Sequence, residues 1–490
     1  MMKNKLSKVA LLLGVILMAT ACKTKVPAQE VKEEEKLNIV YIAVDDLNRW
    51  VGCLGGQAKT PNIDRLASQG MLFTNAHCVV PACNPSRVAI MTGLRPETTD
   101  QYINAGNFRE KPGNANRITM PQYLRQHGYE AVAAGKIFHH PRGKAEEPHP
   151  FSDDISWNYQ NKNNVGTTGH ELYLDEYDQA KWLEGAMRKE GAGKEGASYI
   201  SKFGIWGVTP QKKEETADYQ NAVFSAEYLS KPHEKPFFLA CGIFRPHSPQ
   251  LAPQEFFDMY PLESVKVHDL PEDDMLDIPE HIRKNFSTEF VGHVKAKDQL
   301  QKAIQGYLAS VSFADACIGK VLEGLENGPN KDNTVVVLWT DHGWQLGHKD
   351  RWEKFSLWDI ATNTPLIIKH PKKNIASKRI DQPVSLLDLY PTMMDFVGLE
   401  KPSDLEGVSL APFIQDENYQ RPEPAIITYE EGNQSVRKDG LNYIRYKNGT
   451  EEFYDHTKDK MEYNNIINDE SYASKKEALK KCLDKINSKS

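Results

Sequence analysis

The chain has 490 residues, of which 40% are hydrophobic and 26% are charged, and its formal net charge at pH 7 is −7. This length and composition are typical of a globular enzyme with one large domain and a smaller one. The negative charge argues against a general nucleic-acid-binding protein, so we expect no nucleic-acid partner. An anionic substrate would have to be held by local Lys, Arg or His side chains or by a metal ion.

The first residues predict a targeting segment rather than part of the fold. Three lysines precede an apolar run, residues 9–18, which is too short to span a bilayer. The Ala-Thr-Ala-Cys sequence that follows resembles a bacterial lipobox, which implies lipidation of Cys22; a plain secretory signal cut nearby is the alternative. We therefore expect a lipoprotein signal peptide over 1–22 and a solvated tether over 23–36. The product would be a periplasmic or cell-surface bacterial lipoprotein, held to the membrane only through its lipid.

The first structural element after the tether is a strand that ends in two carboxylates. Residues 37–44 form a nearly continuous apolar, β-branched run, which predicts a central parallel strand buried on both faces. Asp45 and Asp46 follow it directly, where open α/β sheets bind ligands. Adjacent carboxylates repel each other unless a cation lies between them, so a hard divalent metal ion is the economical explanation. Capping of the next segment is the alternative.

The pentapeptide Cys83-Asn84-Pro85-Ser86-Arg87 opens an apolar, helix-like run that contains Thr92-Gly93-Leu94-Arg95-Pro96 at its end. A Cys at a helix N-terminus beside a guanidinium would be an activated group in a pocket that favours anions. An ordinary helix start with a buried Cys is the alternative.

The strand predicted over residues 129–134 is followed by Lys136 and His139. A Lys and a His on a surface loop are common. At a strand end, however, the same residues could bind an anion and move a proton.

Two further apolar strands also end in polar residues. The strand over 236–243 precedes His247, which two prolines hold stiffly. The strand over 334–340 precedes Asp341 and His342. Together with the two earlier aspartates, these residues make a plausible set of four metal ligands.

The remaining segments set the domain limits. Between 140 and about 232 the pattern weakens, which predicts an insertion over the active-site face; a structural apron without a role in recognition is the alternative. Residues 298–326 form an amphipathic helix whose apolar stripe belongs to the core. From about residue 421, short alternating runs predict a small antiparallel sheet closed by a helix over 472–487. We expect a catalytic domain over 37–420 and a small C-terminal subdomain over 421–490.

These motifs resemble the type I sulfatases, and within that family they are most similar to the iduronate 2-sulfatase type. The resemblance extends from residue 38 to about 465. It rests on Val44–Leu47, Cys83–Arg87, Gly135–His139, Arg245–Pro249 and Thr340–Gly347. It implies an alkaline-phosphatase-like α/β sandwich, with a large, mostly parallel central sheet flanked by helices and a small C-terminal antiparallel sheet and helix.

Position by position, the resemblance implies a Ca²⁺ ion bound by Asp45, Asp46, Asp341 and His342, with position 83 (Cys83) as a further metal-binding residue. It also implies that a formylglycine-generating maturase oxidises Cys83 to formylglycine, whose hydrated aldehyde lies beside the metal ion and is the nucleophile.

The same resemblance implies five further catalytic residues: Arg87, Lys136, His139, His247 and Lys354. The guanidinium and the two lysines would neutralise the sulfate oxygens while one hydroxyl of the hydrate attacks sulfur. His247, together with Lys354, would protonate the leaving sugar oxygen. His139 would then take a proton from the remaining hydroxyl, which expels sulfate.

The function expected from this resemblance is that of an exported, exo-acting sulfatase on a sulfated oligosaccharide, with a 2-O-sulfated iduronic or other uronic acid as substrate. A sulfatase for another position or polysaccharide is one alternative. A phosphatase or phosphodiesterase of the alkaline phosphatase superfamily is another, although Cys83 and a single metal set argue against it. A catalytically dead, carbohydrate-binding lipoprotein is the third, and it would be favoured if Cys83 were never converted.

Overall fold

The computed structural model describes residues 36–139, 152–161, 206–285, 299–373, 375–416 and 418–488, which belong to one unit of the chain. The predicted signal peptide, its Cys22 and the tether up to residue 35 lie outside these ranges. Within the described ranges, no helix is both long enough and apolar enough to cross a membrane.

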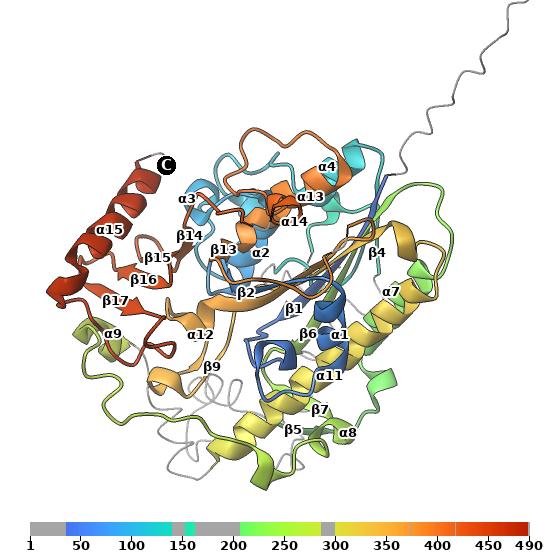
Figure 1. The fold of residues 1–490 in the computed structure, drawn as a ribbon. Helices are drawn as coiled ribbons and strands as arrows, with labels where there is room; N and C mark the ends of the chain where they lie inside the picture. Colours follow the sequence, from blue (N-terminus) through green and yellow to red (C-terminus); the bar gives the residue numbers. More distant parts are fainter. Residues whose placement is uncertain are drawn as a thin grey trace, which may run out of the picture. The chain divides into compact units, whose positions relative to one another are not determined.

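Nine strands of the described residues form one sheet: β1 (Asn38–Asp45), β2 (Met71–His77), β3 (Glu130–Gly135), β4 (Tyr159–Gln160), β6 (Phe237–Pro246), β8 (Thr334–Thr340), β11 (Asn363–Lys369), β12 (Lys378–Ile380) and β13 (Val384–Ser385). Their order is β12-β2-β11-β8-β1-β6-β3-β4, with β13 beside β2. Figure 1 labels β1, β2, β4, β6 and β13 of this sheet. β1 runs parallel to β6 and β8, and β3 runs parallel to β6 and β4, whereas β11 is antiparallel to both of its neighbours. The predicted large, mostly parallel sheet is confirmed.

The longer helices of the described residues are α1 (Pro61–Gln69), α2 (Cys83–Thr92), α4 (Met120–Gln126), α7 (Ala217–Leu229), α11 (Leu300–Glu326), α13 (Leu389–Val397) and α15 (Ala473–Asn487). Shorter helices are α3 (Pro96–Thr99), α8 (Gln254–Phe257), α9 (Glu280–Asn285), α12 (Asp359–Thr362) and α14 (Pro412–Gln415). Two small ribbons pair β5 (Trp206–Thr209) with β7 (Gln250–Pro253), and β9 (Gln345–Leu346) with β10 (Trp352–Glu353).

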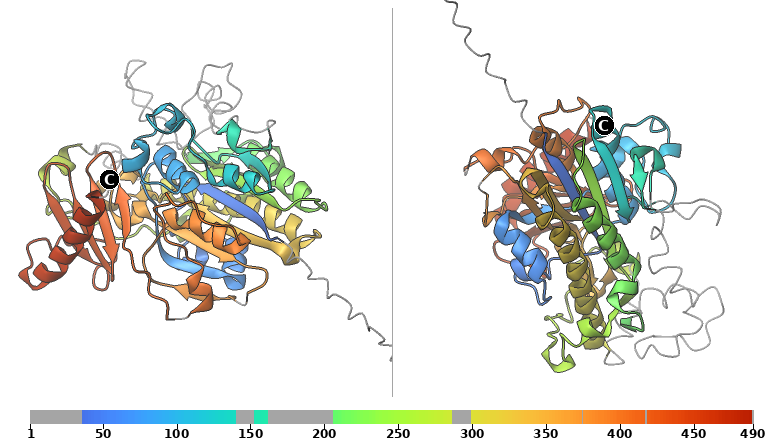
Figure 2. Two further views of the ribbon diagram at one scale, coloured as in Figure 1. Left: turned by 90° about the horizontal axis from the view of Figure 1, so that it is seen from above. Right: turned by 90° about the vertical axis from the view of Figure 1, so that its right-hand side faces the viewer.

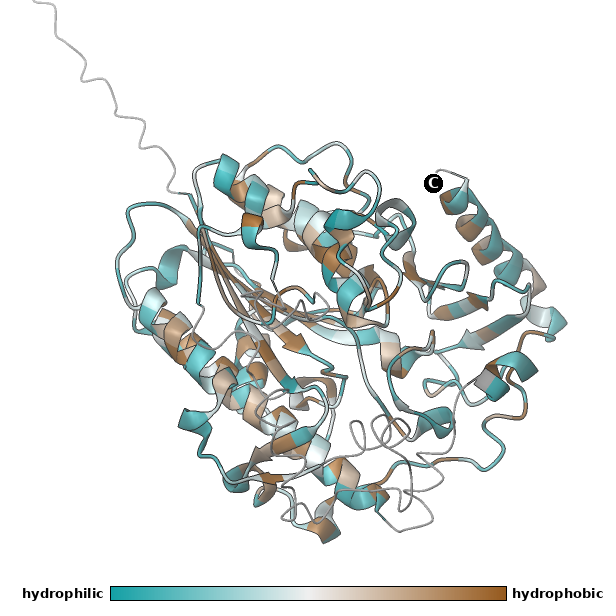
Figure 3. Cartoon of the chain, turned by 180° about the vertical axis from the view of Figure 1, so that it is seen from behind, coloured by the Kyte–Doolittle hydropathy of each residue, from teal (hydrophilic) through white to brown (hydrophobic). Residues whose placement is uncertain are grey.

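The alternation of side chains along β1 divides the core into two layers. Ile39 and Tyr41 belong to the cluster that includes residues of α2, α4 and α13, whereas Val40 and Ile42 belong to the cluster with α1, α7 and α11. All eight residues of β1 are buried, because helices cover both faces of the sheet. Figure 3 shows hydrophobic central strands (brown) between helices that are partly hydrophobic (brown) and partly hydrophilic (teal). The continuous apolar run therefore forms the predicted central strand.

The helix α7 lies inside the segment that the sequence predicts to be an insertion up to about residue 232, and there the prediction is wrong. α7 packs beside α11 (Figure 2) and against β6. Its buried side chains are mostly small or polar: Asp218, Asn221, Ala222, Ser225, Ala226 and Leu229. Because polar side chains fill part of its inner face, the helix shows no hydrophobic period in the sequence. Residues 140–151 and 162–205 of the predicted insertion lie outside the described ranges.

The strand β2 is absent from the predicted elements. Its sequence, Met-Leu-Phe-Thr-Asn-Ala-His, mixes apolar and polar residues without strict alternation. Nearly all of it is buried, because β2 lies between β12 and β11 inside the sheet. Position in the sheet, rather than local pattern, makes this segment a strand.

The C-terminal residues form a second, antiparallel sheet of β14 (Ala425–Thr428), β15 (Gln434–Lys438), β16 (Leu441–Arg445) and β17 (Glu451–Asp455), covered by α15. This confirms the predicted small sheet and helix, while the boundary at residue 420 stays a prediction. Arg437 of β15 contacts Glu462 at 3.0 Å and Asp359 of α12 at 3.3 Å. Burial opposes ionisation of Glu462, yet Arg437 and His456 lower its pKa to about 2. A buried ion cluster thus joins the two sheets.

We predict that Arg437→Ala lowers the free energy of unfolding by about 3–5 kcal/mol, because it leaves Glu462 and Asp359 buried without their main counter-ion. Urea unfolding measures the change. The control is Arg445→Ala in the neighbouring strand, whose partner Asp484 is largely exposed; its expected cost is below about 1 kcal/mol. Equal costs for the two variants would contradict the prediction.

Candidate active site

The predicted site residues come together where strands of the central sheet end. Asp45 ends β1 and Asp46 follows it, while Asp341 and His342 directly follow β8, the parallel neighbour of β1. The carboxyl ends of parallel strands meet at one edge, so these four side chains lie together. The other predicted residues reach this edge from α2 and from the loops after β3, β6 and β10: Cys83, Arg87, Lys136, His139, His247 and Lys354.

Cys83 is the first residue of α2 and is fully buried at the middle of this group. Its Sγ lies 3.5 Å from Oδ1 of Asp45 and 3.3 Å from Nε2 of His342. Nζ of Lys354 lies 3.0 Å from the same sulfur atom. Burial and Asp45 oppose ionisation of the thiol, but Lys136 and Lys354 outweigh them and lower the pKa of Cys83. Position 83 therefore combines carboxylate, imidazole and ammonium neighbours.

The residues present fit a divalent metal ion. The ligand atoms of Asp45, Asp46, Cys83 and His342 all lie within 4.8 Å of one another. Oδ2 of Asp46 is buried and has no hydrogen-bond partner among the described residues. Burial, reinforced by Asp45, raises the pKa of Asp46 to about 8. A cation would satisfy this oxygen and keep both carboxylates ionised. Asp341, the other predicted ligand, borders the group, with its Oδ2 3.6 Å from Nε2 of His342.

Two buried lysines balance the charge of the two adjacent carboxylates. Nζ of Lys354 donates to Oδ1 of Asp46 at 2.7 Å, and Lys136 forms an ion pair with Oδ2 of Asp45. All four side chains are at most 2% exposed. Burial opposes ionisation of Asp45, but Lys136 and further cations hold its pKa well below the ordinary value. The two lysines are thus anchored and point into the site, where they could bind the oxygens of an anionic substrate.

Arg87 connects three parts of the site. Its Nε donates to Oδ2 of Asp341 at 2.7 Å, and its Nη1 donates to the carbonyl oxygens of Lys136 at 2.7 Å and Ile137 at 3.1 Å. One helical position earlier, Oγ of Ser86 donates to the carbonyl oxygen of Asp341 at 2.6 Å. The first turn of α2 is therefore held against the ends of both β8 and β3.

The two predicted proton-transfer residues lie at this edge as well. Nδ1 of His247 contacts the carbonyl oxygen of Ser248 at 2.7 Å, so Nδ1 carries the hydrogen and Nε2 faces Oδ2 of Asp46 at 3.8 Å. Burial lowers the pKa of His139, and Lys136 lowers it further, which keeps this imidazole neutral. Burial also lowers the pKa of His247, and Lys354 lowers it further, so Nε2 of the neutral ring is an acceptor. Both histidines can therefore accept a proton, and His247 can deliver one from Nε2 after it has taken one up there.

Two glycines let the Lys136 loop approach β6. Gly135 has φ +69°, and a Cβ there would lie 1.9 Å from the carbonyl oxygen of Gly242. A Cβ on Gly242 would lie 2.1 Å from the carbonyl oxygen of Lys136. No side chain fits at either position, so the backbone approach that carries Lys136 into the site requires glycine at both.

Tyr307 of α11 is a supporting residue that the sequence did not indicate. Asp46 has φ +60°, and its carbonyl oxygen accepts a hydrogen bond from Tyr307 Oη at 2.8 Å. The same hydroxyl accepts from the backbone N–H of Asn48 at 2.9 Å, and Nδ2 of Asn48 donates to the carbonyl oxygen of Trp344 at 2.9 Å. A Tyr on the buried face of an amphipathic helix needs a hydrogen-bond partner for its hydroxyl. The position of Tyr307 in the apolar stripe of the predicted helix is therefore the sequence feature that could have indicated its supporting role.

Asp218 of α7 supports the loop of His247 in the same way. Its two carboxylate oxygens accept the backbone N–H groups of Phe244 at 2.8 Å and Arg245 at 2.9 Å. The side chain of Arg245 then donates to the carbonyl oxygens of Leu251 at 3.0 Å and His247 at 3.3 Å. These contacts join distant segments, and the sequence offered no sign of them.

Comparison with known proteins shows the family to which the chain belongs. Residues 37–399 match the family model described as "Sulfatase". The chain belongs to the sulfatase family. Residues 347–489 of the sulfatase also match the model described as "N-sulphoglucosamine sulphohydrolase, C-terminal". Members of the family generally use a formylglycine and a divalent metal ion, and the buried cluster around position 83 is where this sulfatase has suitable groups.

Two curated relatives and one solved structure illustrate the similarity. The sulfatase is 37% identical over 489 residues to a protein named "Sulfatase" from Formosa agariphila, covering 97% of this chain and 92% of the relative. It is 30% identical over 411 residues to "Iduronate 2-sulfatase" from Mus musculus, covering 76% of this chain and 71% of the relative. A solved 2-O GAG sulfatase superposes with a TM-score of 0.68 at 24% identity, covering 93% of this chain and 92% of the solved chain. These results confirm a type I sulfatase with an alkaline-phosphatase-like fold.

We predict that Tyr307→Phe lowers kcat of sulfate-ester hydrolysis about tenfold or more, because Asp46 shifts when its carbonyl loses the hydroxyl. The free energy of unfolding should fall by about 1–3 kcal/mol. Steady-state kinetics and urea unfolding measure the two effects.

The matched control is Tyr260→Phe. The hydroxyl of Tyr260 also accepts a backbone N–H, that of Lys59, and pairs with Ser312, but it lies outside the site. We expect a similar loss of stability with unchanged kcat. A Tyr307→Phe enzyme with full kcat would refute the positioning role.

Proposed function

We propose that this sulfatase is an exported, exo-acting lipoprotein that hydrolyses the 2-O-sulfate ester of an iduronic or other uronic acid in a heparin-like or other acidic glycan. The observation that carries the substrate assignment is the 30% identity to an iduronate 2-sulfatase over 76% of the chain. The fold shared with a solved 2-O GAG sulfatase is consistent with it. The buried position of Cys83 supports exo action, because a chain end enters an enclosed centre more easily than an internal sugar does.

The proposed reaction requires a metal ion and a formylglycine, and we place both in the buried cluster around position 83. A Ca²⁺ ion would be held by Asp45, Asp46, Asp341 and His342, because carboxylate oxygens are the ligands a hard cation prefers. Cys83 would be converted to formylglycine by a maturation enzyme. When bound, the metal ion would draw negative charge from the sulfate oxygens. The hydrated formylglycine would supply the hydroxyl nucleophile.

The other residues bind the sulfate and transfer protons. Lys136, Lys354 and Arg87 surround position 83 and would stabilise the charge that grows on the sulfate oxygens in the transition state. His247 would first take up a proton from solvent at Nε2 and then deliver it to the leaving sugar oxygen, while its Nδ1–H stays on the carbonyl oxygen of Ser248. His139, neutral at working pH, would accept the proton whose removal releases sulfate.

A phosphatase or phosphodiesterase of the same superfamily is the second candidate. Such an enzyme would need a Ser or Thr nucleophile and a second metal set. Position 83 is a Cys, and the described residues contain one group with suitable metal ligands. These two observations favour sulfate over phosphate esters. The first experiment below distinguishes the proposed function from a sulfatase for another sugar position and from a dead binding protein.

We predict that protein produced with a formylglycine-generating enzyme carries an aldehyde at position 83 and releases sulfate from a disaccharide that ends in a 2-O-sulfated uronate. Peptide mass spectrometry and ion chromatography measure the two results. Cys83→Ala should abolish release, because no other residue supplies the nucleophile. Release only from other sugars would overturn the uronate assignment and keep the class. An aldehyde without release from a broad panel would favour the binding lipoprotein.

We also predict that chelation by EDTA abolishes activity and that Ca²⁺ restores it. In thermal unfolding, Ca²⁺ at 100 times its Kd should stabilise the protein by about 2.7 kcal/mol. Asp46→Asn should remove this stabilisation, because it deletes a ligand charge. The control Asp395→Asn alters a half-exposed carboxylate paired with Lys401 and should keep it. Restoration by Mg²⁺ but not Ca²⁺ would contradict the choice of metal.

A further inference from the structure

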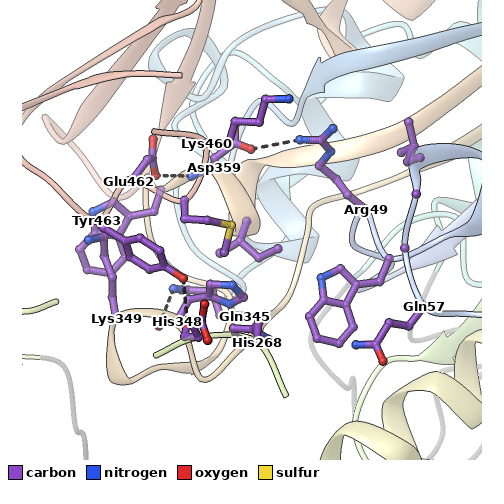
Figure 4. A pocket seen from close by; sticks show the side chains of 18 of the residues that line it. Arg49, Gln57, His268, Gln345, His348, Lys349, Asp359, Lys460, Glu462 and Tyr463 are labelled. Carbon is purple, nitrogen blue, oxygen red and sulfur yellow. Dashed lines mark hydrogen bonds and ion pairs between the residues drawn. The ribbon is translucent and has the colours of Figure 1, made fainter. Parts of the chain in front are cut away.

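A cavity among the described residues lies beside the catalytic cluster and contains none of its residues. Its volume is about 710 Å³, within the range of small-molecule sites. Its walls come from four stretches of the catalytic part, 49–57, 266–269, 345–349 and 358–360, and one C-terminal stretch, 460–463 (Figure 4). Two of these stretches continue directly from the catalytic cluster, since Arg49 follows Asp46 by three positions and Gln345 follows His342 by three.

A pair of histidines forms part of the wall. The rings of His268 and His348 stack with centroids 3.7 Å apart and an interplanar angle of 10°. His348 is only 3% exposed, and no ring nitrogen of either residue has a hydrogen-bond partner in the part of the chain that the structure describes. Burial lowers the pKa of both, that of His268 to about 4. Each neutral ring offers one donor and one acceptor, which hydroxyl groups of a ligand can satisfy.

The uncompensated charge of the cavity is positive. Among its lining residues, Lys349 is paired with Asp274, which lies outside the cavity, at 2.9 Å. Asp359 and Glu462 are both paired with Arg437 of the C-terminal sheet.

The remaining cations of the lining have few anionic partners. Lys266 and Lys460 are exposed and have no ion-pair partner among the described residues. Arg49 reaches Asp359 only at 3.6 Å. The one other acidic residue in the lining is Asp269. A cavity with surplus positive charge in a chain of net charge −7 favours an anionic ligand.

Aromatic side chains complete the lining. Trp50 meets His268 edge to face at 5.3 Å, and Trp358 and Tyr463 stand on other walls. Aromatic rings pack against the C–H faces of sugars while nearby donors and acceptors bind their hydroxyls. Positive charge, aromatic faces and neutral imidazoles together match a carboxylated or sulfated sugar better than a nucleotide or a peptide.

We propose that this cavity is an accessory subsite that binds an anionic sugar unit of the glycan whose sulfate is removed at position 83. The inference rests on the proposed function for the identity of the glycan, but binding in the cavity does not require catalysis. The hairpin of β9 and β10 separates the two sites, because it carries Gln345 and His348 toward the cavity and Lys354 toward Cys83.

The test measures binding of a chemically desulfated, N-acetylated heparin hexasaccharide, which keeps only its carboxylates, to full-length Cys83→Ala protein by isothermal titration calorimetry. We expect saturable binding to one site. The double variant Lys266→Glu/Lys460→Glu should weaken it about tenfold or more. The control Lys231→Glu/Lys235→Glu makes the same charge change at two exposed lysines outside the cavity and should leave binding unchanged.

Three results would overturn the proposal: no binding to the folded protein, equal weakening by both double variants, or equally tight binding of the carboxyl-reduced hexasaccharide. In the active enzyme, Lys266→Glu/Lys460→Glu should raise KM for a sulfated hexasaccharide and leave kcat/KM for a small aryl sulfate unchanged. If the hexasaccharide binds as expected but no sulfate ester is hydrolysed, the proposed function fails and the subsite stands.

Discussion

The structure depends on a balance of buried charges around position 83. Three carboxylates and three cations meet there with almost no exposure: Asp45, Asp46, Asp341, Arg87, Lys136 and Lys354. Each charge would cost several kcal/mol in this environment if it lost its partners. The three carboxylates and the three cations balance each other, so a bound divalent cation would leave two positive charges in excess. That is the charge state in which a sulfate ester is bound and its transition state stabilised.

The fold provides this balance by ending parallel strands at one edge and holding each loop from outside. The carbonyl of Asp46, which has a positive φ, is held by Tyr307 from α11, and the loop of His247 is held by Asp218 from α7. Arg87 binds the loop of Lys136 through backbone carbonyls. Each of these contacts comes from an element far away in the sequence. The catalytic geometry is therefore a property of the packed layers on both faces of the sheet.

The C-terminal sheet takes part in the same arrangement. Arg437 reaches Asp359 of α12, and Glu452 accepts a hydrogen bond from Nε1 of Trp358 at 2.9 Å. These contacts hold residues 358–360, one wall of the proposed subsite, against the C-terminal part. Loops carry recognition when a rigid scaffold positions them. The ion cluster makes the small sheet such a scaffold.

The sequence by itself determined the central strand, the edge of the sheet that carries the site and the residues expected there. Continuous apolar runs followed by Asp, His or Lys are local signals, and strand ends of a parallel sheet meet without further information. The pentapeptide at Cys83 supplied the family. The tertiary structure alone decided β2, α7, the supporting roles of Tyr307 and Asp218, and the cavity beside the hairpin. β2 lacks a pattern because its neighbours in the sheet bury it. α7 lacks one because polar residues fill part of its inner face, where Asp218 accepts the backbone N–H groups of Phe244 and Arg245. Contacts between segments many residues apart leave no periodicity in the chain, so only folding reveals them.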